Sequence, residues 1–567
     1  MAEFYVSPTG DDAATGTATR PFATLERARR AAEEAGGGVV LLRAGTHRLT
    51  GPLRLTEADS GVVYQAFGYG TDAQEEVVVS GGREVDGWRE RDGVLLADVG
   101  DLVTRHLTVN GGRVERAGVD GLPGQVRRTD TGYATDAPLD WVDHAGVEFV
   151  HRGVYPWTEA RLAVAALDRD GDSTAITMAQ PAFGWSLEVY RSEWEGQVTT
   201  GPDAPTRVEG DPSFLAEPGT FALDRSRPGH HVLHYLPRPG ERVRAVVPAL
   251  EVLVHAAGVR DVAFRGLVFA DTTWLRPGGE RGFLHYHANG CYDGGAIGKV
   301  VVGEGAWLTV PEEQVQVPAA VRVDDAAGVR FEGCRFTRLG ATALGVTGGA
   351  DVVVRGCDFD DLAASAVSVV GARDVLVEDN LVRRAGLDHA GSPGVALLDT
   401  ERCTVANNEV RDVPHNGIAA GPGRGTRVLR NLVTGSMGAL ADGGGVYLSG
   451  PQGDDADSGA LIGGNVIEDT RTPYNFGLYT DYGATWVVVE GNVVARADNT
   501  SVLHVSPPLE HVTYRGNFFD ADPVGADTVP AGVTYEGNTT IADPAELAAA
   551  TSAVRARAGL ISPRRGS

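Results

Sequence analysis

The C-terminal half of the sequence repeats a short β run that ends in Gly-Cys or in an asparagine. β-Branched residues alternate along each run, and a polar turn and a second short run such as TALGV or SAVSV follow it. The residues that end the runs, called anchors below, lie 21 to 34 positions apart, at Cys334, Cys357, Asn380, Asn408, Asn431, Asn465, Asn492, Asn517 and Asn538. This pattern predicts a solenoid in which each repeat is one coil of two or three strands.

The variable spacing of the anchors favours a parallel β-helix, because that fold accepts insertions at its turns. A leucine-rich repeat or a propeller would show its own signature at a regular period, and the sequence has neither signature. We therefore predict an all-β fold: a right-handed parallel β-helix with an inserted β-rich, sandwich-like domain and capping helices. Stacked coils would bring the anchor asparagines above one another as a ladder of hydrogen-bonded amides.

The pattern divides the chain into four parts. Residues 1–82 are expected to form an N-terminal cap, with an amphipathic helix near residues 24–35, and the first coils. Residues 83–250 lack the repeat and are expected to form the inserted domain. The main β-helix, with the groove of the active site, is placed at 251–542, broken by a long loop from Asp271 to Pro318. Residues 543–567 are read as a C-terminal capping helix and tail, since Asp543 and Pro544 form a helix-start signal.

Composition narrows the set of partners. The chain of 567 residues has a formal net charge of −26, which disfavours nucleic acid and anionic membranes as partners. The four cysteines lack zinc-ligand spacing and are read as reduced core residues. No signal peptide or membrane span is visible, so the sequence as written predicts a cytoplasmic protein, or a secreted one if a leader was removed. The oligomeric state is left open.

Two aspartates stand beside matching triplets in neighbouring repeats. Gly445-Val446-Tyr447 aligns with Gly477-Leu478-Tyr479, so the aliphatic residues are expected to point inward and Tyr447 and Tyr479 outward. Asp442 precedes the first triplet and Asp481 follows the second. Both carboxyl groups are therefore expected at one outer groove, where the glycines after Asp442 would let a ligand approach. The alternative is that the two aspartates only cap turns.

Tyr447 and Tyr479 are candidates for contacts with a sugar, and so are other polar and aromatic residues. His415 and Asn416 stand one repeat earlier, and Asn475 occupies the matching place in the second repeat. The alternative for His415 is an ordinary surface turn. In the expected loop, Trp274, His285 and His287 are predicted to contact substrate rather than a metal, because no third ligand has diagnostic spacing. No metal site and no cofactor are expected.

Several segments together resemble glycoside hydrolase family 141, a family of right-handed β-helix proteins. They span nearly the whole chain: FYVSPTGDD, RPFATLERAR, VVLLRAGTHRL, VSGGREVDGW, YLPRPGE, DGGGVY and GLYTD. The resemblance implies α-L-fucosidase or xylanase activity on complex plant glycans, with a pair of catalytic aspartates. Carried over by motif, these are Asp442 in DGGGVY and Asp481 in GLYTD.

The leading hypothesis is a glycoside hydrolase acting on an oligosaccharide or polysaccharide. One aspartic acid would protonate the leaving oxygen, and the other would act as nucleophile or as base for water. Which aspartate has which role stays open. The alternatives are a polysaccharide lyase or uronate epimerase on the same fold, and a non-catalytic glycan-binding β-helix.

Overall fold

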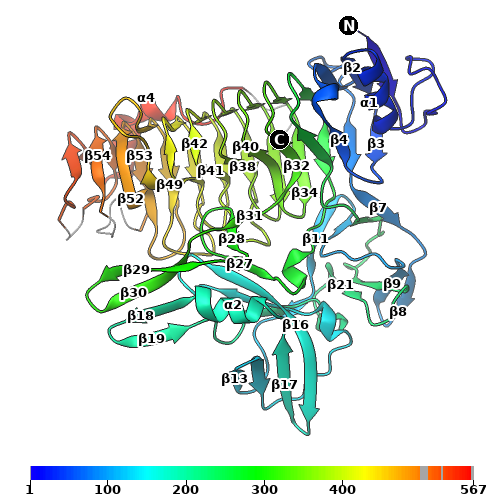
Figure 1. The fold of residues 1–567 in the computed structure, drawn as a ribbon, viewed down its shortest axis with the longest axis horizontal. Coiled ribbons are helices and arrows are strands. Elements are labelled where there is room, and N and C mark those ends of the chain that lie inside the picture. Colours follow the sequence, from blue (N-terminus) through cyan, green and yellow to red (C-terminus); the bar gives the residue numbers. More distant parts are fainter. Residues whose placement is uncertain (1, 499–507, 525–527, 563–567) are drawn as a thin grey trace. The chain divides into compact units, whose positions relative to one another are not determined.

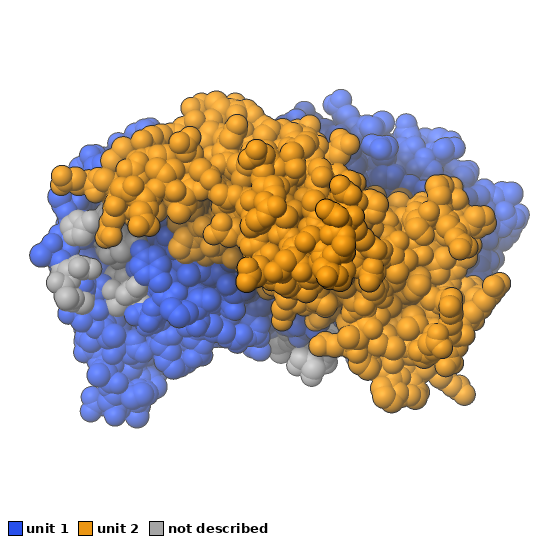
Figure 2. All heavy atoms as spheres, turned by 90° about the horizontal axis from the view of Figure 1, so that it is seen from below, with its two compact units in different colours: residues 1–81, 252–270, 318–567 blue, residues 82–251, 271–317 orange. Residues whose placement is uncertain are grey.

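The computed structural model describes residues 2–498, 508–524 and 528–562. The chain divides into two compact units, shown in separate colours in Figure 2. Unit 1 contains residues 1–81, 252–270 and 318–567, and unit 2 contains residues 82–251 and 271–317.

Unit 1 is a right-handed parallel β-helix, as the repeat predicts, and its successive coils follow one another along a single axis (Figure 1). Its strands form three rows, and strands within a row pair in parallel. Row A consists of β4 (Leu53–Leu55), β24 (Val254–Ala257), β32 (Ala319–Asp324), β35 (Thr342–Thr347), β38 (Val367–Val370), β41 (Val395–Leu398), β45 (Ile418–Ala420), β49 (Gly444–Pro451) and the first part of β52 (Phe476–Glu490).

The other two rows complete each coil. Row B consists of β1 (Glu3–Val6), β2 (Gly38–Leu42), β5 (Val62–Ala66), β25 (Ala263–Arg265), β33 (Arg330–Glu332), β36 (Val353–Arg355), β39 (Leu376–Glu378), β43 (Thr404–Ala406), β47 (Arg427–Leu429), β50 (Ala460–Gly463), the last part of β52, β54 (Glu510–Arg515) and β56 (Val533–Glu536). Row C consists of β3 (Gly45–Arg48), β6 (Val77–Ser80), β26 (Val268–Ala270), β34 (Arg335–Leu339), β37 (Asp358–Leu362), β40 (Leu381–Arg383), β44 (Glu409–Arg411), β48 (Leu432–Thr434), β51 (Val466–Glu468), β53 (Val493–Ala495), β55 (Phe518–Phe519) and β57 (Thr539–Thr540).

The inward side chains of the three rows form one continuous core. Equal positions of neighbouring coils stack, as in the ring pairs Phe264 with Phe331 and Phe336 with Phe359, whose centroids are 5.0 Å and 4.6 Å apart. Helix α1 (Leu25–Glu34) adds its buried leucine and alanines to the N-terminal end of this core. It therefore covers apolar surface that the first coil would otherwise expose.

The predicted asparagine ladder runs from Asn380 to Asn538. In each step the side-chain Nδ2 donates to Oδ1 of the next anchor asparagine at 2.9–3.0 Å, and also to a backbone carbonyl of the preceding coil. The ladder starts where the backbone N–H of Cys357 donates to Asn380. These bonds satisfy amides that are almost wholly buried, which a core of this kind requires.

The C-terminal segment binds along the side of the coils, which differs from the end cap expected from the sequence. Helices α3 (Pro544–Ala550) and α4 (Ser552–Arg555) precede a stretch whose backbone bonds to three coils. Asn407 donates to the carbonyl of Arg557 at 2.9 Å, and the N–H of Ile561 donates to Asp379 at 2.8 Å. Polar turn residues of the coils thus hold this segment, rather than an apolar end surface.

Unit 2 is rich in strands. One sheet contains β7 (Gly82–Val85), β8 (Arg89–Arg91), β9 (Val94–Asp98), β10 (Leu107–Val109), β11 (Gly112–Arg116), β21 (Thr220–Asp224), β22 (Val232–Leu236) and β23 (Ala245–Pro248). A second contains β12 (Gly118–Val119), β13 (Val126–Thr129), β14 (Gly132–Thr135), β15 (Glu148–Arg152), β16 (Glu159–Asp170), β17 (Ser173–Met178), β20 (Arg207–Glu209), β27 (Phe283–His285), β28 (Gly290–Tyr292) and β31 (Val315–Gln316). A third contains β18 (Arg191–Trp194), β19 (Gln197–Thr200), β29 (Ile297–Gly303) and β30 (Ala306–Pro311), and helix α2 (Ala182–Val189) also belongs to this unit.

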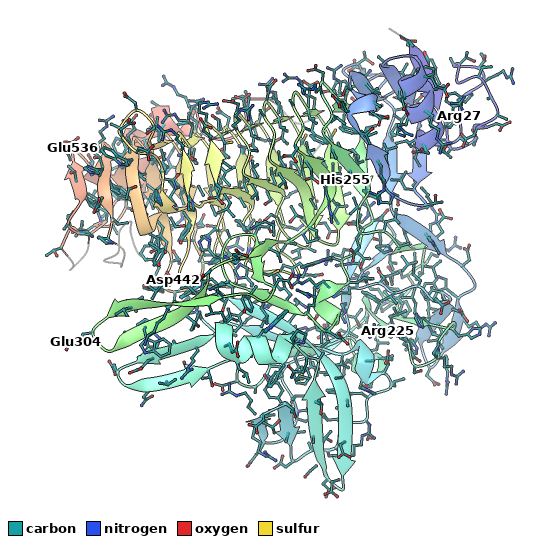
Figure 3. All side chains as sticks on the ribbon, viewed as in Figure 1. Arg27, Arg225, His255, Glu304, Asp442 and Glu536 are labelled. Carbon is teal, nitrogen blue, oxygen red and sulfur yellow. The ribbon has the colours of Figure 1, made fainter. Side chains whose placement is uncertain are left out.

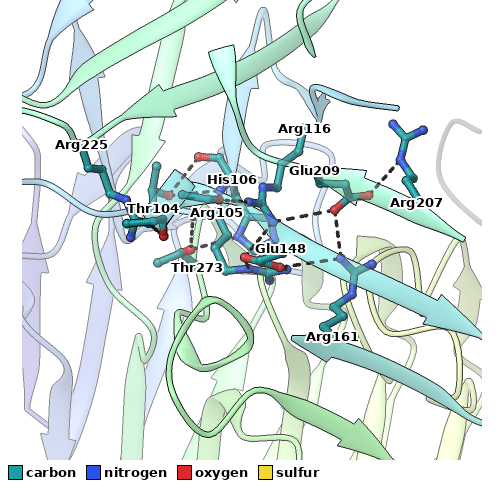
Figure 4. A network of polar contacts seen from close by, with 12 residues as sticks. Thr104, Arg105, His106, Arg116, Glu148, Arg161, Arg207, Glu209, Arg225 and Thr273 are labelled. Carbon is teal, nitrogen blue, oxygen red and sulfur yellow. Dashed lines mark hydrogen bonds and ion pairs between the residues drawn. The ribbon is translucent and has the colours of Figure 1, made fainter. Parts of the chain in front are cut away.

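A buried ion-pair network lies inside unit 2 (Figure 4). Glu148 receives two hydrogen bonds from Arg105, at 2.7 and 2.8 Å, and its carboxylate also pairs with Arg116. Burial acts to raise the pKa of Glu148, but the neighbouring guanidinium groups hold it well below its usual range. Glu148 is therefore charged, and its partners compensate a charge that could not otherwise be buried.

Candidate active site

The two matched triplets lie side by side in row A. Tyr447 of β49 pairs in register with Tyr479 of β52, and Val446 pairs with Leu478. The two aliphatic side chains belong to the core of the β-helix, as predicted. The two tyrosine rings lie on the other side of the strands, in a separate apolar cluster with Ala419 and Phe476.

Each aspartate is bound by the tyrosine of the other coil. The Tyr479 hydroxyl donates to Oδ1 of Asp442 at 3.0 Å, and the Tyr447 hydroxyl donates to Oδ2 of Asp481 at 2.8 Å. The two rings meet edge to face, with centroids 5.2 Å apart. The structure therefore brings both aspartates and both tyrosines of the sequence prediction to one place, and Figure 3 labels Asp442 just before β49.

Residues of the preceding coil hold the turn that contains Asp442. His415 Nε2 lies 3.2 Å from the carbonyl of Ala441, and Asn416 Oδ1 accepts the N–H of Gly444 at 2.7 Å. A carbonyl only accepts, so Nε2 of His415 is the nitrogen that carries the proton. Both side chains are buried, at 3% and 1% exposure, and Nδ2 of Asn416 lies 3.3 Å from Nδ1 of His415. The residues predicted to contact sugar thus position the turn of Asp442.

The glycines after Asp442 make room for protein atoms. A Cβ on Gly443 would lie 2.6 Å from Oδ1 of Asn416 and 2.7 Å from Nε2 of His415. This corrects the expectation that these glycines open a path for a ligand, because the space is already filled. Asp442 itself has a φ of +55°, and its N–H donates to the carbonyl of Tyr474 at 2.8 Å.

The electrostatics of the two carboxyl groups differ. Burial and the neighbouring Asp481 raise the pKa of Asp442 to about 7. Burial also raises the pKa of Asp481, but hydrogen bonds from Tyr447, the backbone of Tyr482 and Tyr479 oppose that rise. Two nearby carboxyl groups rarely both ionise in a poorly solvated site, so the pair favours a state with one proton between them.

Two exposed tyrosines beside the pair were not singled out by sequence reasoning. Tyr474 is 42% exposed and Tyr482 is 39% exposed. Burial of part of its surface, together with Asp442 and Asp481, raises the pKa of Tyr474 to about 12. Its ring meets Phe476 edge to face. The only signal in the sequence was the closeness of these tyrosines to GLYTD.

Three of the predicted contact residues are enclosed. Asn475 is 1% exposed, and its amide bonds to Thr470 and to the carbonyl of Thr472. In unit 2, Trp274 is 4% exposed and packs against Phe283, and His285 has no exposed surface. Side chains enclosed in this way cannot contact a sugar, so these three assignments are corrected. The same correction applies to Tyr447 and Tyr479, which are 5% and 2% exposed.

His287 is half-buried, and burial lowers its pKa to about 4. It belongs to the stretch 271–317, which was expected to be a loop. That stretch contains strands β27 to β31, and β27 pairs with β16 in unit 2. The loop expectation is therefore wrong, because long-range strand pairing organises these residues.

Within the described residues, no group of three or more histidine, cysteine, aspartate or glutamate side chains is arranged to hold a metal ion. In the same part of the chain, none of the helices is both long and apolar enough for a membrane span.

Comparisons with known proteins agree on the fold. The family model described as "Right handed beta helix region" matches residues 315–453. A solved structure titled "Glycoside hydrolase" is similar over 99% of both chains, with a TM-score of 0.73 and 22% sequence identity. The structure of XylC in complex with xylose is similar over 91% of this chain and 75% of that chain, with a TM-score of 0.50 and 12% identity. No curated protein matches the sequence significantly.

Proposed function

We propose that the protein is a glycoside hydrolase whose catalytic residues are Asp442 and Asp481. The observation that carries this proposal is the pair of crossed hydrogen bonds, from Tyr479 to Asp442 and from Tyr447 to Asp481. Hydrolysis of a glycosidic bond needs one carboxylic acid and one carboxylate close to the same bond. Two aspartates with separated pKa values, held on adjacent coils, meet this requirement.

In this mechanism Asp442 is the general acid. Its pKa of about 7 keeps much of it protonated at neutral pH, so it can donate a proton to the leaving oxygen. Asp481 is the carboxylate, because its hydrogen bonds stabilise the charged form. It attacks the anomeric carbon or activates a water that does so. The anomer of the first-formed product, observed by NMR, distinguishes these two routes.

We propose a substrate of the plant-glycan type, either an α-L-fucoside or a xylose-containing chain. The motifs DGGGVY and GLYTD support this choice through their resemblance to glycoside hydrolase family 141. The titles of the two similar structures, a glycoside hydrolase and a xylose complex, point the same way. A panel of aryl α-L-fucosides, aryl xylosides and fucosylated or xylan oligosaccharides covers both possibilities.

The test compares the parent with Asp442→Asn, Asp481→Asn and a control, Asp457→Asn, which changes an exposed loop residue. Each of the first two variants should lose activity by roughly 10²–10⁴, the usual contribution of an acid or base, and the control should keep it. Circular dichroism checks that the fold is intact. An unsaturated product absorbing in the ultraviolet would show a lyase instead, and tight glycan binding without turnover by the parent would show a binding protein.

A further inference from the structure

One position of most coils, at the turn that enters row B, takes a left-handed backbone; Gly459, in the coil of β50, is an exception. The strand registers align this position across coils, and we call it the turn rung. Its φ lies between +50° and +70° in the coils from β25 to β47, where the residues are Asp261, Gly328, Asp351, Asp374, Arg402 and Gly425. Glycine and aspartate adopt this conformation more easily than bulky residues do.

Two later coils place aromatic residues at the turn rung. Trp486 in β52 and His511 in β54 have φ values of +58° and +55°. Their positions follow from the register Thr485 with Glu510 and Val487 with Val512. Bulky side chains are uncommon at such a φ and add strain, and strained residues gather at functional sites.

The aromatic rings at these positions lie outside the core. Val487 and Val512, the next residues, belong to the core of the β-helix, and Trp486 and His511 do not. The two rings stack in parallel, with centroids 3.9 Å apart and planes 10° from each other. His511 is exposed. The core therefore does not explain why these two coils have aromatic residues where the earlier coils have glycine, aspartate or arginine.

A cavity adjoins His511 on the side of the next coil. Gly532 occupies the turn rung there and offers no side chain. The cavity has a volume of about 400 Å³ and is lined by Glu510, His511, Gly532, Val533 and Thr534. An aromatic face with a carboxylate and a hydroxyl beside it provides what a pyranose ring needs: a surface for its C–H groups and partners for its hydroxyls.

The strand β52 connects this cavity to the candidate catalytic pair. Asp481 and Trp486 are five positions apart in β52, and at about 3.3 Å per residue their separation is at most roughly 17 Å. A sugar bound at the stack can therefore belong to the same oligosaccharide as the sugar that Asp481 attacks.

We propose that the Trp486 and His511 stack, with the adjoining cavity, binds a pyranose ring of a longer substrate away from the bond that is cleaved. This inference rests on the proposed function for its chain-length consequence. It makes the protein an enzyme of oligosaccharides or polysaccharides, and it gives a role to two aromatic residues in strained positions.

Trp486→Gly and His511→Gly test the proposal, because glycine removes the ring and accepts the left-handed backbone without strain. The matched control is Asp351→Gly, an exposed residue of the same turn rung in an earlier coil. For each variant, kcat/KM is measured on a xylan or fucosylated oligosaccharide and on the corresponding aryl monosaccharide. The ratio of the two values should fall roughly three- to tenfold in the first two variants and stay constant in the control.

Binding separates the failure of this inference from the failure of the proposed function. Calorimetry with the same oligosaccharides is carried out in the Asp481→Asn background, with and without Trp486→Gly. Weaker binding after Trp486→Gly supports the stack as a sugar site even if the parent hydrolyses nothing. Unchanged binding and an unchanged kcat/KM ratio overturn the stack as a sugar site even if the parent is an active hydrolase.

Discussion

The hydroxyl of Tyr479 donates a 3.0 Å hydrogen bond to Asp442, a residue of the coil before its own. The reverse contact joins Tyr447 to Asp481 at 2.8 Å. Burial and the aspartates raise the pKa of both phenols well above 10, so both stay donors over the working pH range of the protein. The protonation of each carboxyl group is therefore controlled from the neighbouring coil.

Removing one phenol at a time should change the pH profile in different ways. Tyr479→Phe removes bonds that lower the pKa of Asp442 and of Asp481, so the pH at which activity declines on the basic side should rise, together with the acidic limb. Tyr447→Phe removes the main bond that lowers the pKa of Asp481, so the acidic limb should move upward. Profiles of kcat/KM from pH 4 to 9 measure both shifts. Identical profiles for the two variants would contradict the assigned roles.

The parent protein should lose activity as pH rises through about 7, because the acid Asp442 gives up its proton there. The same group affects stability. Its folded pKa lies above its unfolded value of 3.8, so the folded state binds the extra proton and the free energy of unfolding decreases as pH rises from about 4 to 7. Asp442→Asn should remove this decrease and raise the melting temperature at pH 8. Asp457→Asn is the control, and an equal effect there would contradict the assignment.

Gly443→Ala should reduce activity and stability together. The added Cβ would meet Asn416 and His415 at 2.6 and 2.7 Å, so the turn of Asp442 must move. Overpacking of this kind costs about 1–3 kcal/mol, which chemical denaturation measures beside kcat. Gly51→Ala is the matched control, because its Cβ would meet nothing within 4 Å. Full activity in Gly443→Ala would show that the position of this turn is unimportant.

Alanine substitutions in the asparagine ladder should lower the free energy of unfolding most in the middle of the ladder. Asn465→Ala leaves the buried backbone N–H of Asn431 without its acceptor and removes one of the two donors to Oδ1 of Asn492, and should lower the free energy of unfolding by about 2–4 kcal/mol. Asn538→Ala, at the half-buried last step, should cost about 1 kcal/mol. Denaturant titrations of both variants give the comparison. A larger loss at Asn538 than at Asn465 would be inconsistent with burial as the cause.

The sequence predicts the β-helix and the tyrosine register because coils repeat. The matching triplets Gly445-Val446-Tyr447 and Gly477-Leu478-Tyr479 place Tyr447 beside Tyr479, and the repeated anchors predict the asparagine ladder. Both aspartates could be predicted as site residues because they stand next to these triplets. A periodic pattern is therefore enough to predict the β-helix and the positions of the two carboxyl groups.

Contacts outside the repeat leave no periodic pattern in the sequence, so they could not be predicted in this way. Strand β27 pairs with β16, more than a hundred positions earlier, so the stretch after Asp271 reads as a loop in the sequence. The N-cap Asp543 predicts where helix α3 begins. The place of the C-terminal segment on the coils, however, depends on single polar groups, such as Asn407, which binds the carbonyl of Arg557. The role of His415 could not be predicted either, because the spacing of residues does not show that its side chain is buried against a backbone carbonyl.

The chain leaves the spiral after Gly81, returns at Val252 for one coil, and leaves again after Ala270. Phe264 nevertheless pairs with Tyr64, 200 positions earlier, so the spiral cannot continue until a very long loop has closed. Strands within unit 2 close this loop. Strands β7 and β23 lie at the two ends of the first segment of unit 2, and they pair with each other. This pairing shortens the effective tether between β5 and β25, and so lowers the chain entropy lost when the second stretch of the spiral joins the first.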